Sequence, residues 1–270
     1  MAISAKDVMT LRQRTGVGMM ECKTALQEAD GDMEAAIGLL REKLKGDMEE
    51  RSDRQASEGV IAIGRNDRSV SMVELLSETD FAARNETFVE TAQKIADLVL
   101  DGPDGQQEAS DAISALVDDL RITIKENISL GRAVRMSGSA LGSYLHHDRQ
   151  SGALVVGEGE FSDALLTGLC QHVVAAVPPM VPAPLAVDES GIRAEVLAEQ
   201  KSKLEAEARE SGKPDSIIEK MIVGKIRKWV ADNTLLGQTY IRELDAKKPV
   251  SHYLAKGATI TSFVRFKIGD

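Results

Sequence analysis

Cysteine is scarce in this chain of 270 residues, which contains only Cys22 and Cys170. The two cysteines lie far apart, and neither has a second Cys or a paired His at the spacing of a zinc site. Cys170 and His172 are close in sequence, but two isolated ligands do not make a site. The sequence therefore predicts no metal site, and scattered cysteines of this kind are typical of a reducing compartment.

Aromatic residues and positive charge are also in short supply. Aromatic residues make up 3% of the chain, which leaves little material for platforms that stack on bases. The chain has 33 Lys plus Arg against 43 Asp plus Glu, a formal net charge of -10, which opposes nonspecific attraction to phosphates. We therefore expect no direct binding of nucleic acid.

The chain has no apolar run that could cross a membrane. The segment Met1–Asp7 lacks the apolar core of a secretory signal. The most apolar window, 164–187, contains Gln171 and His172 and ends in four prolines, which stop a helix before it could span a bilayer. We expect a buried core helix followed by an extended linker, no membrane contact and a cytoplasmic location.

Motifs for nucleotide or covalent chemistry are missing as well. Gly16-Val17-Gly18 follows no strand and lacks a third glycine, and neither Gly212-Lys213 nor Gly224-Lys225 is followed by Ser or Thr. His146 and His147 are adjacent, so on a strand they would point to opposite faces. The sequence predicts no cofactor and no active site of its own, so we do not expect an enzyme.

What is present begins with a small helical bundle. Residues 4–45 carry apolar residues at helical spacing in three short stretches, separated by Thr15-Gly16-Val17-Gly18 and by Asp30-Gly31-Asp32. An Asp in the second break can cap the third helix. The charged segment 46–58 reads as a linker or an exposed extension of that helix.

The pattern then changes to strands. Residues 59–63 and 70–76 predict a hairpin with a turn at Asn66-Asp67, and the apolar residues from Phe88 to Val99 predict a helix on it. The same order recurs as strands at 141–146 and 153–156, a turn at 150–152 and a helix at about 161–177. Between the two lie a helix through 113–124 and a strand at 132–136.

The last third of the chain adds a helical hairpin and a final strand. Residues 190–230 contain two helical stretches separated by Ser211-Gly212-Lys213-Pro214, and the sparse apolar positions of the first arm predict a projecting antiparallel coiled coil. In the final strand Ile260, Val264, Phe266 and Ile268 alternate with Thr261, Arg265 and Lys267. The fold class is therefore α+β.

The run Glu74–Asn85 is the most informative stretch, because it places Thr79, Asp80 and Phe81 where the second strand turns into a helix. Such connections often carry function. Local sequence favours a structural interpretation, in which Thr79 or Asp80 caps the helix and Phe81 folds inward as a hydrophobic staple. The alternative is a loop whose aromatic side chain contacts a partner.

Several separate segments resemble bacterial elongation factor Ts. They are the run from Leu11 to Leu26 (LRQRTGVGMMECKTAL), Thr79-Asp80-Phe81, Gly142-Ser143-Tyr144 with His146, Ser211-Gly212-Lys213-Pro214, Leu236-Gly237-Gln238 and Phe263-Val264-Arg265-Phe266. Their order and spacing fit the family along essentially the whole chain. One departure is Ala82, where the family usually has Val.

The resemblance implies a guanine-nucleotide exchange factor for the GTPase elongation factor Tu, with a UBA-like N-terminal bundle. It assigns Thr79, Asp80 and Phe81 to a loop that intrudes near the magnesium and phosphate site of the GTPase, which reverses the local preference for a staple. Arg12, Met19, Met20 and Lys23 would lie in or near the contact made by the bundle. His146 would face another domain of the GTPase, and a homodimer or a 2:2 complex stays open.

The expected domains are residues 1–55 (bundle and linker), 56–140 (first core subdomain), 141–187 and 231–270 (second core subdomain) and 188–230 (coiled-coil hairpin). The alternative from another class is a scaffold that recognises a helix through its bundle and leaves nucleotide exchange unchanged. The Asp80-Phe81 loop discriminates between the two functions, since a scaffold has no need for a wedge aimed at a phosphate site.

Overall fold

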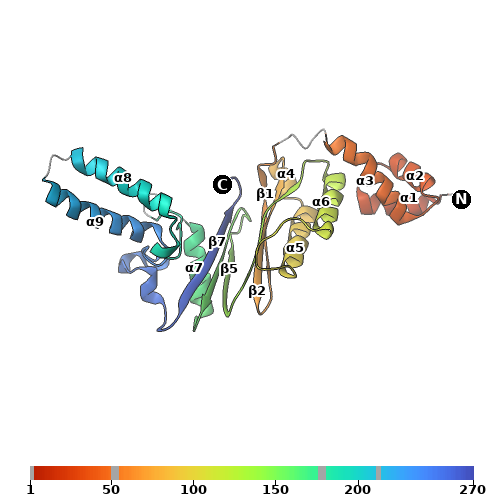
Figure 1. The fold of residues 1–270 in the computed structure, drawn as a ribbon. Coiled ribbons are helices and arrows are strands. Elements are labelled where there is room, and N and C mark those ends of the chain that lie inside the picture. Colours follow the sequence, from red (N-terminus) through yellow and green to blue (C-terminus); the bar gives the residue numbers. More distant parts are fainter. Residues whose placement is uncertain (1–2, 50–54, 176–180, 211–213) are drawn as a thin grey trace. The chain divides into compact units, whose positions relative to one another are not determined.

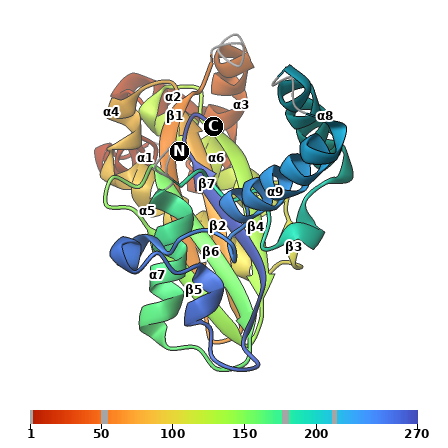
Figure 2. The same cartoon turned by 90° about the vertical axis from the view of Figure 1, so that its left-hand side faces the viewer.

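The computed structural model describes residues 3–49, 55–175, 181–210 and 214–270, and it mixes helices with antiparallel strands. Contacts divide the chain into two compact units. Unit 1 holds residues 1–136, 145–151 and 266–270, and unit 2 holds residues 137–144 and 152–265. Figure 1 gives the labels of the elements, and Figure 2 shows the same ribbon from the side.

Unit 1 begins with the predicted bundle, made of α1 (Ala5–Thr15), α2 (Met19–Glu28) and α3 (Met33–Glu49). The breaks work as expected: Gly16 ends α1 in the left-handed conformation with φ of 67°, and the Asp32 carboxylate accepts a bond of 2.9 Å from the Ala35 N–H. The helix α3 extends to Glu49, into the segment expected to be a linker or a helix extension. Residues 50–54 of that segment lie outside the described residues.

The bundle buries a small apolar core of its own, which consists of Val8, Leu11, Val17, Cys22, Ala25, Leu26, Ala36, Ile37, Leu40 and Ile122. Ile122 comes from α6 (Asp111–Ile124) in the rest of unit 1. Arg41 of α3 also donates to the Asp119 carboxylate of α6, with an Nη2–Oδ1 distance of 2.6 Å. Both contacts tie the bundle to α6.

The main part of unit 1 is a four-stranded sheet in the order β1-β2-β4-β3. Its strands are β1 (Glu58–Arg65), β2 (Ser69–Ser77), β3 (Gly105–Gln106) and β4 (Ser129–Ser137). The predicted hairpin is confirmed, since β1 and β2 pair antiparallel from Glu58–Ser77 to Arg65–Val70.

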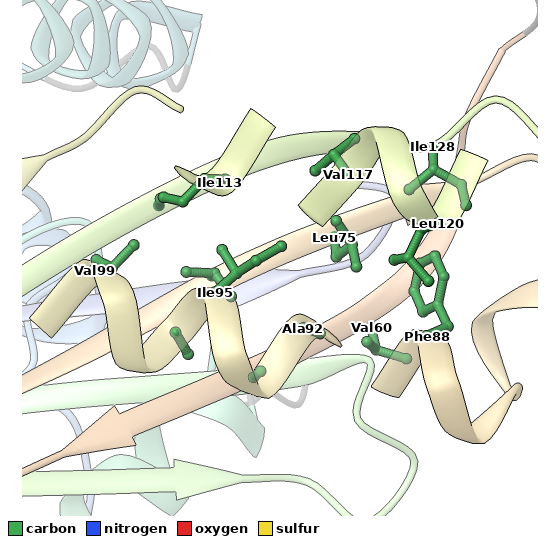
Figure 3. Packing of buried hydrophobic residues seen from close by; sticks show 14 of the residues in the cluster. Val60, Leu75, Phe88, Ala92, Ile95, Val99, Ile113, Val117, Leu120 and Ile128 are labelled. Carbon is green, nitrogen blue, oxygen red and sulfur yellow. The ribbon is translucent and has the colours of Figure 1, made fainter. Parts of the chain in front are cut away.

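Two helices complete the core of unit 1 on this sheet. Residues from α5 (Glu86–Leu100) and α6 pack with residues of the strands, as Figure 3 shows for Phe88, Ile95 and Leu120. The predicted helical spacing from Phe88 to Val99 is confirmed, because Phe88, Ala92, Ile95, Ala96 and Val99 are buried on one side of α5. The short helix α4 (Asp80–Ala83) lies between β2 and α5.

Unit 2 contains a three-stranded sheet in the order β5-β6-β7, from β5 (Ala140–Leu145), β6 (Ser151–Glu158) and β7 (Thr259–Lys267). The helix α7 (Asp163–Ala175) contributes to its core. Short 3-10 turns follow at η1 (Glu189–Gly191), η2 (Ile241–Ala246) and η3 (Val250–Tyr253). The two long helices α8 (Ala194–Glu210) and α9 (Asp215–Asn233) lie side by side in both views (Figure 1 and Figure 2).

The prediction for the turn between β5 and β6 was wrong by about two residues. Ser151 already belongs to β6, and the turn centres on Asp148 and Arg149. The Asp148 carboxylate accepts a bond of 2.9 Å from the Gln150 N–H, and Arg149 adopts a positive φ of 59°. An Asp side chain that folds back on its own backbone makes a turn without glycine.

Three further predictions concern the end of the final strand, two segments near prolines and glycine, and membrane spans. Ile268 lies just beyond the end of β7 rather than in the final strand. The expected turn at Ser211-Gly212-Lys213 and the prolines Pro178 and Pro179 lie outside the described residues. No helix within the described ranges is long and apolar enough to cross a membrane.

Candidate partner-binding site

The short helix α4 forms because Thr79 caps it. Thr79 is extended, with φ of -126° and ψ of 153°, and its Oγ1 accepts a bond of 3.2 Å from the Ala82 N–H. Six residues after Thr79, Asn85 caps α5 by accepting a bond of 2.9 Å from the Thr87 N–H. Two caps so close together confine α4 to a single turn, with a defined start and a defined end.

A carboxylate from a distant segment holds the start of α4. Glu126 accepts a bond of 2.7 Å from the Thr79 hydroxyl at Oε1 and a bond of 3.1 Å from the Thr79 N–H at Oε2. A second link runs the other way, since Glu78 Oε1 accepts a bond of 2.7 Å from the Asn127 N–H. Bonds to ionised acceptors are short and strong, so these links fix α4 to the segment that follows α6.

Phe81 projects from this frame into solvent. It is 80% exposed, whereas its neighbours Ala82 and Ala83 are each 5% exposed and anchor the inner side of α4. Phe88 fills the core below instead. The cap at Thr79 is thus confirmed, and the local interpretation of Phe81 as an inward staple, which the family resemblance had already reversed, was wrong. An exposed phenyl ring on a braced turn is available to a partner surface.

Asp80 lies beside Phe81 and is paired within α4. Its Oδ2 is 3.0 Å from Nη2 of Arg84 one turn later, and both side chains are substantially exposed. Asp80 and Arg84 line a pocket of about 530 Å³ together with the start of β1 and residues 147–150 of the β5–β6 turn. The Asp80 carboxylate is therefore accessible on the surface next to the Phe81 ring.

The histidine pair does not lie on a strand as expected, because β5 ends at Leu145. His146 and His147 begin the β5–β6 turn, and their ring centroids are 4.3 Å apart. His147 lines the pocket beside Asp80, while His146 is half-buried and outside its lining. The Arg149 carbonyl accepts a bond of 2.7 Å from the Ile61 N–H, which ties this turn to β1.

The bundle presents a second exposed surface. Met19 and Met20, at the start of α2, are 48% and 73% exposed, and Lys23 follows on the same face one turn later. Arg12 is exposed on α1. Within the described parts of the chain neither Lys23 nor Arg12 makes an ion pair, so both charges face solvent.

Comparison with known proteins identifies the family. The family model described as "Elongation factor TS" matches residues 78–270. An elongation factor Ts from Alkalilimnicola ehrlichii is 39% identical over 282 residues, covering 100% of this chain and 93% of that protein. The chain belongs to the elongation factor Ts family. Relatives of the same name from Thioalkalivibrio sulfidiphilus and Psychrobacter sp. are 37% and 39% identical over 93% and 91% of their lengths.

The elongation factor Ts resemblance found in the sequence is thereby confirmed, and it rests on the whole chain rather than on one motif. The structure brings Thr79, Asp80 and Phe81 together on one braced turn with the β5–β6 turn beside it. Arg12, Met19, Met20 and Lys23 gather separately on the bundle. Both surfaces belong to unit 1.

Sequence reasoning missed three residues of this candidate site, namely Arg84, Glu126 and His147. Arg84 could have been found, since an Asp and an Arg four residues apart on one helix commonly pair. Glu126 is 47 residues from Thr79, so no local signal links the two. His147 enters the pocket only because the turn begins earlier than its composition indicated.

In the part of the chain that the structure describes, no group of three or more His, Cys, Asp or Glu residues is placed to hold a metal ion. Cys22 and Cys170 are free and buried. His172, near Cys170 in sequence, instead bonds through Nε2 to the Gln238 side chain at 2.9 Å. The two candidate ligands noted in the sequence thus serve packing and hydrogen bonding.

Proposed function

We propose that this chain is a guanine-nucleotide exchange factor for elongation factor Tu: it promotes release of GDP from that GTPase so that GTP can bind during protein synthesis. The observation that carries the proposal is Phe81, an exposed ring on a turn braced by Thr79 and Glu126. A phenyl ring is most often buried, and here its exposure on a turn braced at its start supports a binding role.

Exchange follows from linkage between two ligands of one protein. A factor that binds the nucleotide-free GTPase more tightly than the nucleotide-bound form weakens nucleotide affinity by the same ratio. No bond is made or broken in the factor, so we propose that the chain is not itself an enzyme. A GTPase holds GDP through phosphate contacts and Mg²⁺, and displacing the backbone around them loosens both together.

In this mechanism Phe81 supplies the apolar wedge. Burying its ring on docking contributes roughly 1.5–3 kcal/mol, which is enough to offset part of the cost of displacing a supporting loop. Asp80 supplies a polar contact once its pairing with Arg84 is exchanged for one with the partner. Thr79 acts as the cap that aims both side chains.

The remaining contacts are assigned on the family pattern. Arg12, Met19, Met20 and Lys23 dock a UBA-like bundle on the nucleotide-binding domain of the GTPase, and His146 faces another of its domains. The exposed methionines suit an adaptable apolar contact. The helices α8 and α9 form a projecting coiled coil. The chain binds elongation factor Tu, and a homodimer and a 2:2 complex are the two modes of association open to it.

The domain boundaries at 1–55, 56–140, 141–187, 188–230 and 231–270 and the cytoplasmic location remain part of the proposal. The direct test is release of fluorescent GDP from elongation factor Tu in excess unlabelled nucleotide, with and without this chain. Strong acceleration at a substoichiometric amount supports exchange, because one molecule must then act on many GTPase molecules. Binding without acceleration would instead favour the scaffold that recognises a helix through its bundle.

A further inference from the structure

The sulfur atoms of this chain are unevenly exposed to solvent. Both cysteines are fully buried, and so is Met72 in β2. Among the methionines whose side chains the structure describes, the exposed ones are Met9, Met19 and Met20, with 54%, 48% and 73% of their surface accessible. All three belong to α1 and α2 of the N-terminal bundle. Among the sulfur-containing side chains that the structure describes, those of the bundle are therefore the most accessible to a small oxidant in solution.

We propose that Met19 and Met20 form a reversible oxidation site that controls partner binding. The inference rests on the proposed function, since Met19 and Met20 are assigned there to the docking surface. The co-reactant is a hydroperoxide. With hydrogen peroxide, the thioether sulfur attacks one oxygen, a sulfur–oxygen bond forms as the oxygen–oxygen bond breaks, and the released hydroxide takes the proton of the transferred hydroxyl, which leaves the sulfoxide and water.

The sulfur loses two electrons in this step and the peroxide gains them, so the reaction balances without a further reagent. Its product, the sulfoxide, is polar and chiral, whereas the thioether is apolar and flexible. A polar group buried at an interface without a hydrogen-bond partner disfavours docking. Thiol chemistry offers no competing route, because Cys22 and Cys170 lie within the cores of their units.

The location matters because oxidation would leave the fold intact. Met19 and Met20 do not belong to the core of the bundle, which α2 fills with Cys22, Ala25 and Leu26. Their sulfoxides would therefore remain in water in the free protein and become unfavourable only on docking. Methionine sulfoxide reductases reverse the change, so the surface can switch in both directions.

The experiment treats the full chain with hydrogen peroxide under native conditions and follows peptide masses over time. The peptide with Met19 and Met20 (residues 15–23) and the peptide with Met9 (residues 7–12) should gain oxygen well before the peptide with buried Met72. Uniform oxidation of all three peptides, or faster oxidation at Met72, would overturn the proposed site.

The same samples are then assayed for function, by measuring how much they accelerate GDP release from elongation factor Tu. Oxidation should lower the acceleration by wild type about ten-fold, and treatment with sulfoxide reductases should restore it. The variant Met19→Leu/Met20→Leu cannot form the sulfoxide, so its rate after peroxide should equal its own rate before. The matched control Met9→Leu should stay as sensitive as wild type.

Two results would overturn the effect on binding: oxidation at Met19 and Met20 without a change in exchange, or equal sensitivity of the double Leu variant. The second result would place the sensitive group elsewhere. If the untreated chain did not accelerate GDP release at all, the proposed function would fail and the effect on exchange with it. The peptide masses would still decide the modification site in that case.

Discussion

The carboxylate of Glu126 accepts two hydrogen bonds from Thr79, one of 3.1 Å from the backbone N–H and one of 2.7 Å from the side-chain hydroxyl. Thr79 is at the same time the cap of α4 and sits two residues before Phe81. Glu126 follows α6, where Lys125 closes the helix in the left-handed conformation with φ of 64°. The direction of the exposed ring is therefore set by a contact between two segments far apart in the sequence.

We predict that Glu126→Gln slows exchange several-fold, because an amide can replace only one of the two accepting oxygens and loses the charge. The loss of stability should be modest, about 1–2 kcal/mol, so the variant stays folded at 25 °C. GDP release and urea unfolding measure the two effects. Glu90→Gln, an exposed carboxylate on α5, is the matched control.

If Glu126 acts by positioning Phe81, the double variant Glu126→Gln/Phe81→Ala should reveal it. Once the ring is gone its direction no longer matters, so Glu126→Gln should add little to the loss caused by Phe81→Ala alone. Multiplicative losses in the double variant would show that Glu126 acts independently of the ring.

Phe81→Ala should reduce the acceleration of GDP release about ten-fold or more, because the variant loses the apolar burial that docking provides. The ring is 80% exposed in the free protein, so the midpoint of unfolding should hardly change. Exchange assays at several factor concentrations separate weaker binding from a slower step. Leu98→Ala, an exposed residue of α5, is the control. Full activity of Phe81→Ala would reject the wedge.

Lys23→Glu should slow association with elongation factor Tu, since Lys23 is exposed and forms no ion pair within the described residues. Charge at an interface mainly affects the association rate, and salt screens it over about 8 Å at physiological ionic strength. The defect should therefore shrink in high salt when binding is followed by stopped flow. Lys43→Glu, on the exposed side of α3, should bind as wild type does.

The elements that the sequence predicts correctly are those specified by contacts between residues close together in the chain. The bundle and the β1–β2 hairpin were predictable because apolar spacing and local caps such as Asp32 specify them within a few residues. The β5–β6 turn was misplaced because Gln150-Ser151-Gly152 has the composition of a turn, whereas the backbone reverses at Asp148 and Arg149. Composition does not reveal which polar side chain folds back.

The candidate site also combines a feature that local sequence predicts with features that depend on distant segments. The cap at Thr79 is a local feature and was predictable, but whether Phe81 points in or out depends on the room inside the core, which Phe88 already fills. The brace from Glu126 spans 47 residues and appears only once α6 and β2 have been brought together. Family resemblance supplied the importance of Phe81, and the structure supplied the reason for its exposure.

Removing Arg132 from its pair with the buried Glu74 carboxylate should destabilise unit 1. Glu74 is nearly buried and holds the Arg132 guanidinium at 2.8 and 3.0 Å, a bond that raises the pKa of Arg132. Arg132→Met would remove the ion pair of the buried Glu74 carboxylate, which keeps only a bond of 3.2 Å from the residue 132 N–H, and should cost about 1–3 kcal/mol in urea unfolding. Glu74→Met/Arg132→Met should recover much of the loss. A double variant as unstable as the single one would contradict this account, and Lys228→Met, from an exposed pair on α9, should change little.

Stability should also depend on pH through His172, which is fully buried in unit 2. Burial lowers its pKa below the ordinary 6.5. Its Nδ1 accepts a bond of 3.2 Å from the Ile241 N–H, so this nitrogen has no room for a proton, while Nε2 donates to Gln238.

The unfolded chain binds a proton at His172 more readily than the folded chain does. The contribution of His172 is therefore complete above pH 6.5 and is lost as the pH falls from there toward the lowered pKa of the folded state. Urea unfolding of wild type and His172→Gln should show a stability difference that shrinks between about pH 8 and about pH 5.5. An unchanged difference would mean that the imidazole is protonated equally in both states, which its bond with the Ile241 N–H opposes.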